Sequence, residues 1–146
     1  MTFIDISVLI GDSVPVWDGD ARPLMVEDQT KYERGTIQTT TITMNVHTGT
    51  HIDAPRHFFP DGLTASEILL ENLNGSCIVL EIDSSDEMIS RQDLISARLT
   101  GPYDRVLLRT GNSRLWDSEG NRFFKEYAAL DDSVAQYLVA LGVKLV

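Results

Sequence analysis

Apolar positions in the first third of the chain follow the period of two that is typical of β-strands. Residues 3–10 are rich in apolar side chains and predict a strand. In residues 36–46, Ile42, Met44 and Val46 alternate with polar residues, which predicts a second strand with one buried face. This second strand leads directly into the part of the chain that holds every histidine.

Helical and strand patterns alternate in the remainder of the chain. They predict helices over residues 64–74, 90–99 and 132–141, and strands over residues 77–82, 105–109 and 143–146. Thr64 with Glu67, and Ser90 with Asp93, have the capping-box spacing that opens a helix. Alternation of this kind is typical of an α/β fold, and the threonine-rich region near residue 40 adds antiparallel character. We therefore expect one α/β domain with a mixed sheet over residues 1–146.

The strand predicted over residues 143–146 stands at the end of the sequence. Either it pairs at the edge of a sheet, or the sequence stops before the fold is complete. Natural domains seldom end on an unpaired apolar edge, so we favour the second alternative and expect the domain to be incomplete at its C-terminus.

Length, charge and composition limit the size, binding partners and location that we expect for this protein. The 146 residues suffice for one ordinary domain, and the formal charge of −10 argues against nucleic-acid binding and against an anionic membrane surface. There is no signal-peptide pattern and no apolar run of bilayer length, so we expect a cytoplasmic protein. The single cysteine, Cys77, has apolar neighbours and is expected to be buried and unreactive.

The three histidines, His47, His51 and His57, lie within residues 44–58, and Asp53 stands between the last two. Imidazole nitrogens and carboxylate oxygens are usual ligands of zinc, manganese and similar divalent ions. All four positions share one parity, so an extended backbone would direct them to one side. The pattern predicts a metal site where a strand runs into a curved loop.

Such a site has a definite chemistry. A divalent ion held by three protein groups leaves a position for water, whose pKa falls to about 7, and the resulting hydroxide attacks a carbonyl carbon. His57 can accept the proton and hand it to the leaving group, although a fourth ligand or a structural hydrogen bond would also explain it. Thr48 and Thr50 are candidates to hold the ligand imidazoles, and Gly49 permits a sharp turn between them. Asp53 could instead cap a turn.

Residues 47–58 resemble the His-x-Gly-Thr-His-x-Asp-x-Pro-x-His-Phe signature of the cyclase family, which includes the bacterial kynurenine formamidases and the isatin hydrolases. Residues 4–7 resemble the opening strand of that family. Residues 14–20 resemble its Pro-Val-Trp-Pro-Gly-Asp loop, with Asp18 in place of the second proline, and residues 108–112 resemble a later strand and loop.

The resemblance implies a metal site built on His47, His51 and Asp53, with one or two zinc or manganese ions per chain and Asp53 able to bridge two of them. It implies that His57 is the proton-shuttling catalytic residue and that Trp17 lines the substrate pocket. A core position for the Trp17 ring is an equal alternative. The implied fold is a barrel-like, swivelling β/β/α domain that forms a homodimer or a homotetramer.

Two functional hypotheses follow. The first is a metal-dependent hydrolase of a small amide, lactam or lactone, similar to the arylformamidases of tryptophan catabolism. The second is an inactive fragment or pseudoenzyme that retains a partial metal site and acts only by binding. The second arises because the family takes further ligands, including a histidine, from a C-terminal region, and this chain has no fourth histidine.

Overall fold

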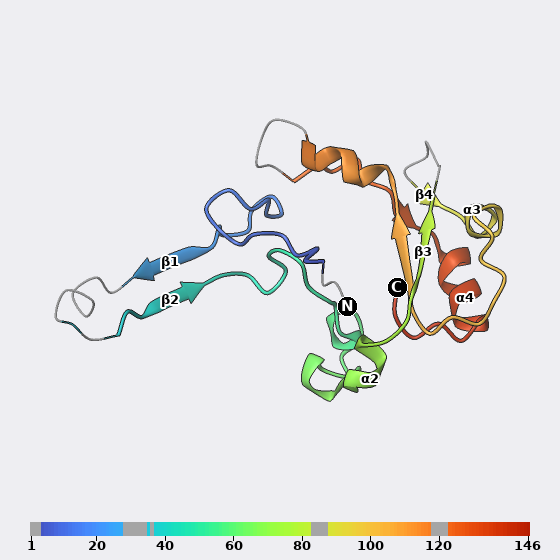
Figure 1. Cartoon of the computed structure of the whole chain (residues 1–146), viewed down its shortest axis with the longest axis horizontal. Helices are drawn as coiled ribbons and strands as arrows, with labels where there is room; N and C mark the ends of the chain where they lie inside the picture. The colour runs from blue at the N-terminus through green and yellow to red at the C-terminus, as the bar shows by residue number, and fades with distance from the viewer. Residues whose placement is uncertain (1–3, 28–34, 36, 83–87, 118–122) are drawn as a thin grey trace. The chain divides into compact units, whose positions relative to one another are not determined.

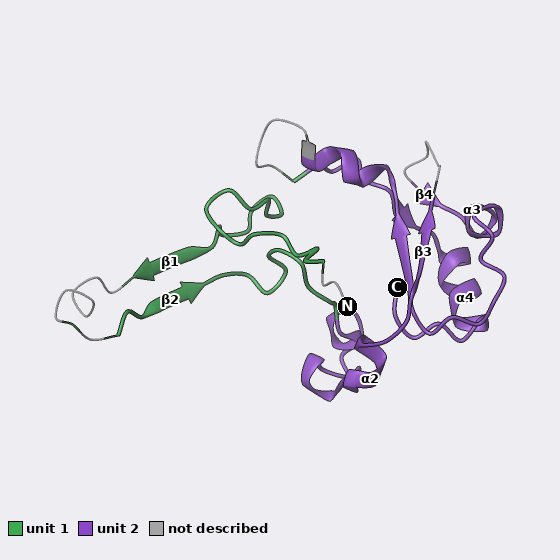
Figure 2. Ribbon diagram, in the orientation of Figure 1, with its two compact units in different colours: residues 1–53, 120–123 green, residues 54–119, 124–146 purple. Residues whose placement is uncertain are grey.

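The computed structural model describes residues 4–27, 35, 37–82, 88–117 and 123–146, and these form two compact units (Figure 2). Unit 1 comprises Met1–Asp53 with Gly120–Phe123, and unit 2 comprises Ala54–Glu119 with Phe124–Val146. That the two units belong to one domain stays a prediction.

Unit 1 contains an antiparallel ladder of β1 (Leu24–Glu27) and β2 (Thr40–Thr43) (Figure 1). All residues of both strands are exposed, and the Ile42 side chain is 55% accessible. The predicted buried face is therefore wrong, because the described part of unit 1 contains no helix or second sheet that covers the ladder.

The strand predicted over residues 3–10 is also wrong over residues 4–10, which join no ladder, while Phe3 lies outside the described residues. The backbone N–H of Val8 donates to the side-chain oxygen of Thr50 at 2.9 Å instead of to a neighbouring strand. The pattern of apolar residues here marks a segment that packs on a loop, as described below.

Unit 2 is built on two parallel ladders. β3 (Ile78–Glu81) pairs with β5 (Val106–Arg109), and β4 (Met88–Ile89) pairs with β6 (Ala129–Leu130). Leu145 makes one parallel bridge to Arg105, so the strand predicted over residues 143–146 is present as a single bridge beside β5. The strands predicted over residues 77–82 and 105–109 are confirmed.

The described helices are η1 (Pro55–His57), η2 (Ala65–Glu67), α2 (Leu70–Leu73), α3 (Arg91–Ser96), η3 (Gly111–Asp117) and α4 (Asp132–Ala140), where η marks a 3₁₀ turn. The three predicted helices correspond to η2 with α2, to α3 and to α4, whereas η1 and η3 were not predicted. Both capping boxes form, and the backbone N–H groups of Thr64 and Ser90 each donate to the carboxylate three residues on at 2.8 Å. The first predicted helix is broken in two because Ile68 has extended backbone angles.

The core of unit 2 lies between the sheet and two helices, since α3 and α4 pack against β3 and β5 (Figure 1). Its buried apolar side chains are Leu80, Ile82, Ile89, Leu94, Leu99, Val106, Val134 and Leu138. Alternate positions on β3 and β5, such as Val79 and Leu107, remain exposed. Cys77 shares the parity of Val79 and is exposed, so its predicted burial is wrong.

A mixed α/β architecture is therefore confirmed. The described strands form three separate two-stranded ladders and no closed barrel, because each ladder is only two to four residues long and none joins the next. Among the described residues, no helix has the length and apolar character required to cross a membrane.

The end of α3 yields a stability prediction. Arg98 has a φ of +65°, its N–H donates to Ile95, and the N–H of Leu99 donates to Leu94. This left-handed helix end favours glycine. Arg98→Gly should raise the free energy of unfolding by about 1 kcal/mol, as measured by urea denaturation. The control Gln136→Gly, inside α4, should lower it by about the same amount, and destabilisation by Arg98→Gly would contradict the assignment.

The start of α4 yields a pH prediction. Hydrogen bonds from Ser133 and from the Val134 N–H hold the pKa of Asp131 below its ordinary 3.8. A carboxyl with a lowered folded-state pKa contributes stability above the unfolded pKa and loses it as pH falls through the folded pKa. Asp131→Asn retains a capping oxygen without a titrating group. Urea midpoints between pH 5 and pH 3 should therefore fall less in Asp131→Asn than in the unchanged chain, and equal falls would contradict this account.

Candidate metal centre

The histidine segment leaves β2 through a tight turn. The side-chain oxygen of Asn45 accepts a hydrogen bond from the His47 N–H at 2.9 Å, and the Asn45 carbonyl accepts one from the Thr48 N–H at 3.1 Å. Gly49 follows with a φ of +74°, a conformation that L side chains rarely adopt. The segment is therefore a bend that follows the end of β2, as the sequence predicted, and not an extended run.

This bend brings three of the four predicted side chains together. His47 Nδ1 lies 3.2 Å from His51 Nε2 and 3.1 Å from Asp53 Oδ1, and His51 Nε2 lies 3.5 Å from the same carboxylate oxygen. The three side chains are about one-third to two-fifths exposed, at 35%, 32% and 43%. All three belong to unit 1.

The triangle of donor atoms has the size that one small divalent ion requires. Three donors that bind one zinc ion tetrahedrally at about 2.0–2.1 Å stand about 3.4 Å apart. The observed separations of 3.1, 3.2 and 3.5 Å lie around this value. Two imidazoles and a carboxylate also form a donor set that zinc and manganese accept. The residues present therefore fit a divalent metal ion.

A backbone carbonyl orients one of the two imidazoles. His51 Nδ1 lies 2.8 Å from the Gly49 carbonyl oxygen, which can only accept, so the proton of the neutral ring is assigned to Nδ1. His51 Nε2 is then unprotonated, and its lone pair is available to a metal ion beside His47 Nδ1 and Asp53 Oδ1. Histidines that bind metals commonly donate the N–H of their second ring nitrogen to a backbone carbonyl or a carboxylate in this way.

The two threonines do not play the role that the sequence suggested. Thr50 Oγ1 accepts the Val8 N–H, and Thr48 Oγ1 is buried and has no hydrogen-bond partner among the described residues. The oxygen that holds the imidazole belongs to the backbone of Gly49, a group that no side-chain pattern reveals.

His57 lies in unit 2, within η1. Its N–H donates to the Ala54 carbonyl at 2.8 Å, and its ring packs edge-on against Phe58 with centroids 4.5 Å apart. His57 therefore belongs to a different unit from His47, His51 and Asp53, and its role in proton transfer stays a prediction.

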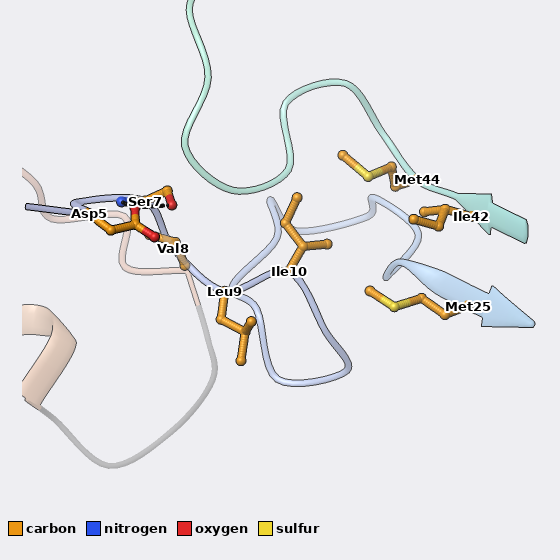
Figure 3. A pocket seen from close by; sticks show the side chains of 8 residues that line it. All are labelled: Asp5, Ser7, Val8, Leu9, Ile10, Met25, Ile42 and Met44. Carbon is orange, nitrogen blue, oxygen red and sulfur yellow. Dashed lines mark hydrogen bonds between the residues drawn. The ribbon is translucent and has the colours of Figure 1, made fainter. Parts of the chain in front are cut away.

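Trp17 lies on the loop before β1 and is 52% exposed. Its ring packs against Phe123, with centroids 4.7 Å apart and an interplanar angle of 59°. A separate cavity of about 490 Å³ in unit 1 does not include Trp17. Figure 3 shows Asp5 and Ser7 at one end of that cavity and Met25, Ile42 and Met44 at the other. The substrate-binding role of Trp17 stays a prediction.

Comparison with known proteins places these features in a family. The chain is 31% identical to a kynurenine formamidase of Bacillus cereus and 30% identical to one of Bacillus mycoides, over 144 residues in each case. These alignments cover 99% of this chain and 66% of each relative, so the chain spans just under two thirds of their length.

Solved structures agree. The chain matches a potential metal-dependent hydrolase with cyclase activity with a TM-score of 0.74 and 27% identity, over 96% of this chain and 63% of the other. It matches a predicted metal-dependent hydrolase from Bacillus stearothermophilus with a TM-score of 0.72 and 28% identity, over 96% and 64% respectively. The model of the family described as Putative cyclase matches residues 4–146, and the chain therefore belongs to this family.

Proposed function

We propose that this chain carries the metal-binding part of a metal-dependent hydrolase that cleaves a small amide, lactam or lactone. The observation that supports the proposal is the convergence of His47, His51 and Asp53, whose ligand atoms all lie within 4.8 Å of one another. Exposed acidic side chains are common on protein surfaces, but two imidazoles that meet a carboxylate at these distances form a donor set with a specific use.

Each residue has a part in this proposal. When bound, a zinc or manganese ion would supply an activated water and polarise the carbonyl of the substrate. His47 Nδ1, His51 Nε2 and Asp53 Oδ1 would hold it, and the Gly49 carbonyl would fix the tautomer of His51. His57 would take the proton from the attacking water and deliver it to the leaving amine or alkoxide.

The substrate class follows from the named relatives and from one aromatic side chain. Two relatives are kynurenine formamidases, which points to an arylformamide such as N-formylkynurenine as the first substrate to test. The exposed ring of Trp17 would contact the aryl group of such a substrate. We also propose one or two metal ions per chain and a homodimeric or homotetrameric assembly.

The alternative is a protein that binds a metal or a ligand without turnover. It would hold if turnover requires a second metal ion, because the cluster found among the described residues offers three protein ligands, enough for one ion. Metal stoichiometry by mass spectrometry and formamide hydrolysis, measured on the same purified 146-residue chain, separate the two functions. Bound metal with turnover supports the hydrolase, and bound metal without turnover supports the alternative.

Loss of one proposed ligand should strongly weaken metal binding. Asp53→Asn removes the carboxylate that both histidines face, so zinc affinity measured by calorimetry should fall by more than about 100-fold, beyond the usual cost of losing an outer-shell group. The matched control is Asp61→Asn, which changes an exposed aspartate outside the cluster and should leave the affinity unchanged. Equal zinc affinities of Asp53→Asn and Asp61→Asn would show that Asp53 is not a metal ligand.

His57 should affect turnover and not metal binding. His57→Gln keeps a polar side chain but removes the titrating group, and loss of general acid–base catalysis typically costs about 10²–10⁴-fold in rate. We expect kcat for N-formylkynurenine to fall within this range while zinc stoichiometry stays constant. If the metal is lost together with activity, His57 is a ligand and the proton-transfer assignment is wrong.

A further inference from the structure

The N-terminal segment, residues 5–10, contacts the bend that carries the proposed metal ligands. We define the metal loop as residues 45–53. Two contacts join the segment to this loop, one through Thr50 and one through Ile10. All of these residues belong to unit 1.

The first contact is a hydrogen bond across 42 positions of sequence. The Val8 N–H donates to Thr50 Oγ1 at 2.9 Å, and Thr50 stands between Gly49 and the ligand His51. The backbone just before Val8 is itself fixed, because Asp5 accepts hydrogen bonds from both the N–H and the hydroxyl of Ser7. These hydrogen bonds also lower the pKa of Asp5, so its carboxylate stays charged at neutral pH.

The second contact is steric. A Cβ built on Gly49 would lie 3.1 Å from Ile10 Cγ1 and 3.4 Å from Ile10 Cδ1, so the Ile10 side chain packs directly on the glycine. The carbonyl oxygen of that same glycine accepts a hydrogen bond from His51 Nδ1 at 2.8 Å. The position of Ile10 is thus connected to the orientation of the His51 ring through a single residue.

The geometry points to Thr50 and Ile10 as positioning residues that hold the metal loop in its ligating conformation. This inference rests on the proposed function, since it assigns these residues a role toward the metal ion that His47, His51 and Asp53 would bind. Without the two contacts, the bend around Gly49 would be less ordered before metal binds, and the free energy of ordering it would be subtracted from the affinity.

The test compares two variants of Thr50 in the full 146-residue chain. Thr50→Val keeps the shape but removes the acceptor, whereas Thr50→Ser keeps the acceptor. Loss of groups that orient metal ligands typically costs about 10–100-fold in metal affinity. We expect calorimetric zinc affinity to fall in this range for Thr50→Val and to stay close to that of the unchanged chain for Thr50→Ser.

A spectroscopic readout excludes a merely structural effect. The visible absorption of bound Co²⁺ reports its coordination, and we expect it to change in Thr50→Val and to be retained in Thr50→Ser. The control Thr41→Val makes the same replacement on β2, away from the metal loop in sequence, and should alter neither the affinity nor the spectrum. Circular dichroism without metal verifies that each variant is folded.

A second pair of variants covers the case in which Thr50→Val does not fold. Ile10→Ala removes the contact with Gly49 and should weaken zinc binding, whereas Ile10→Val retains Cγ1 and should bind nearly as the unchanged chain does. Folded Thr50→Val and Ile10→Ala with unchanged affinity and unchanged Co²⁺ spectrum would overturn the inference and leave the proposed function intact. If the unchanged chain binds no metal, the proposed function fails and this inference fails with it.

Discussion

A positive φ at Gly49 is the constraint on which the candidate site depends. At +74° the backbone turns back between the two histidines, so that their ring nitrogens stand 3.2 Å apart and Asp53 reaches both. The same residue presents its carbonyl to His51 and its bare α-carbon to Ile10. A side chain at this position would strain the backbone, and its Cβ would lie only 3.1 Å from Ile10 Cγ1, so that Ile10 would have to shift slightly. One glycine thus sets the turn, the tautomer and the packing of the loop.

The two units of the chain rely on different forces. Unit 2 is held by a dry core between parallel strands and two capped helices, in which Leu94, Leu99 and Val106 are fully buried. Burial of such side chains is the dominant source of folding free energy. The described part of unit 1 has little apolar burial apart from Val14, and its order comes from turns, the β1–β2 ladder and a few hydrogen bonds such as that from Val8 to Thr50. Its loop geometry therefore depends on a few specific contacts.

Within unit 2, one arginine connects the turns after residue 54 to the sheet. Arg105 is buried at the start of β5 and donates to the carbonyls of Glu71 and Asn72 at the end of α2. The guanidinium fills the space beside Gly75, where a Cβ would lie 2.7 Å from Arg105 Nη1. These bonds satisfy helix-end carbonyls that have no partner within the helix.

The helix starts and the candidate metal ligands could be predicted from the sequence because they depend on local interactions. The capping boxes at Thr64 and Ser90, the apolar face of α4 and the His-x-Gly-Thr-His-x-Asp spacing all involve residues close in sequence. The structure contains the predicted helix starts and brings His47, His51 and Asp53 together. The family resemblance is confirmed as well, since the family model matches residues 4–146. The capping boxes and the metal-site motif each depend on residues that are close together in the sequence.

Contacts between distant residues decided the rest. The apolar run at residues 4–10 has the pattern of a strand, but the hydrogen bond from Val8 to Thr50 and the packing of Ile10 on Gly49 place it on the metal loop. Residues 36–46 have the alternation of a half-buried strand, but nothing in the described part of unit 1 covers residues 40–43, and Thr36 lies outside the described residues. The carbonyl that orients His51 belongs to the backbone and leaves no trace in side-chain identity. The sequence by itself determined which groups could bind a metal ion and which elements form locally. Only the tertiary structure decided what each segment packs against, because burial and long-range hydrogen bonds depend on partners that sequence spacing does not specify.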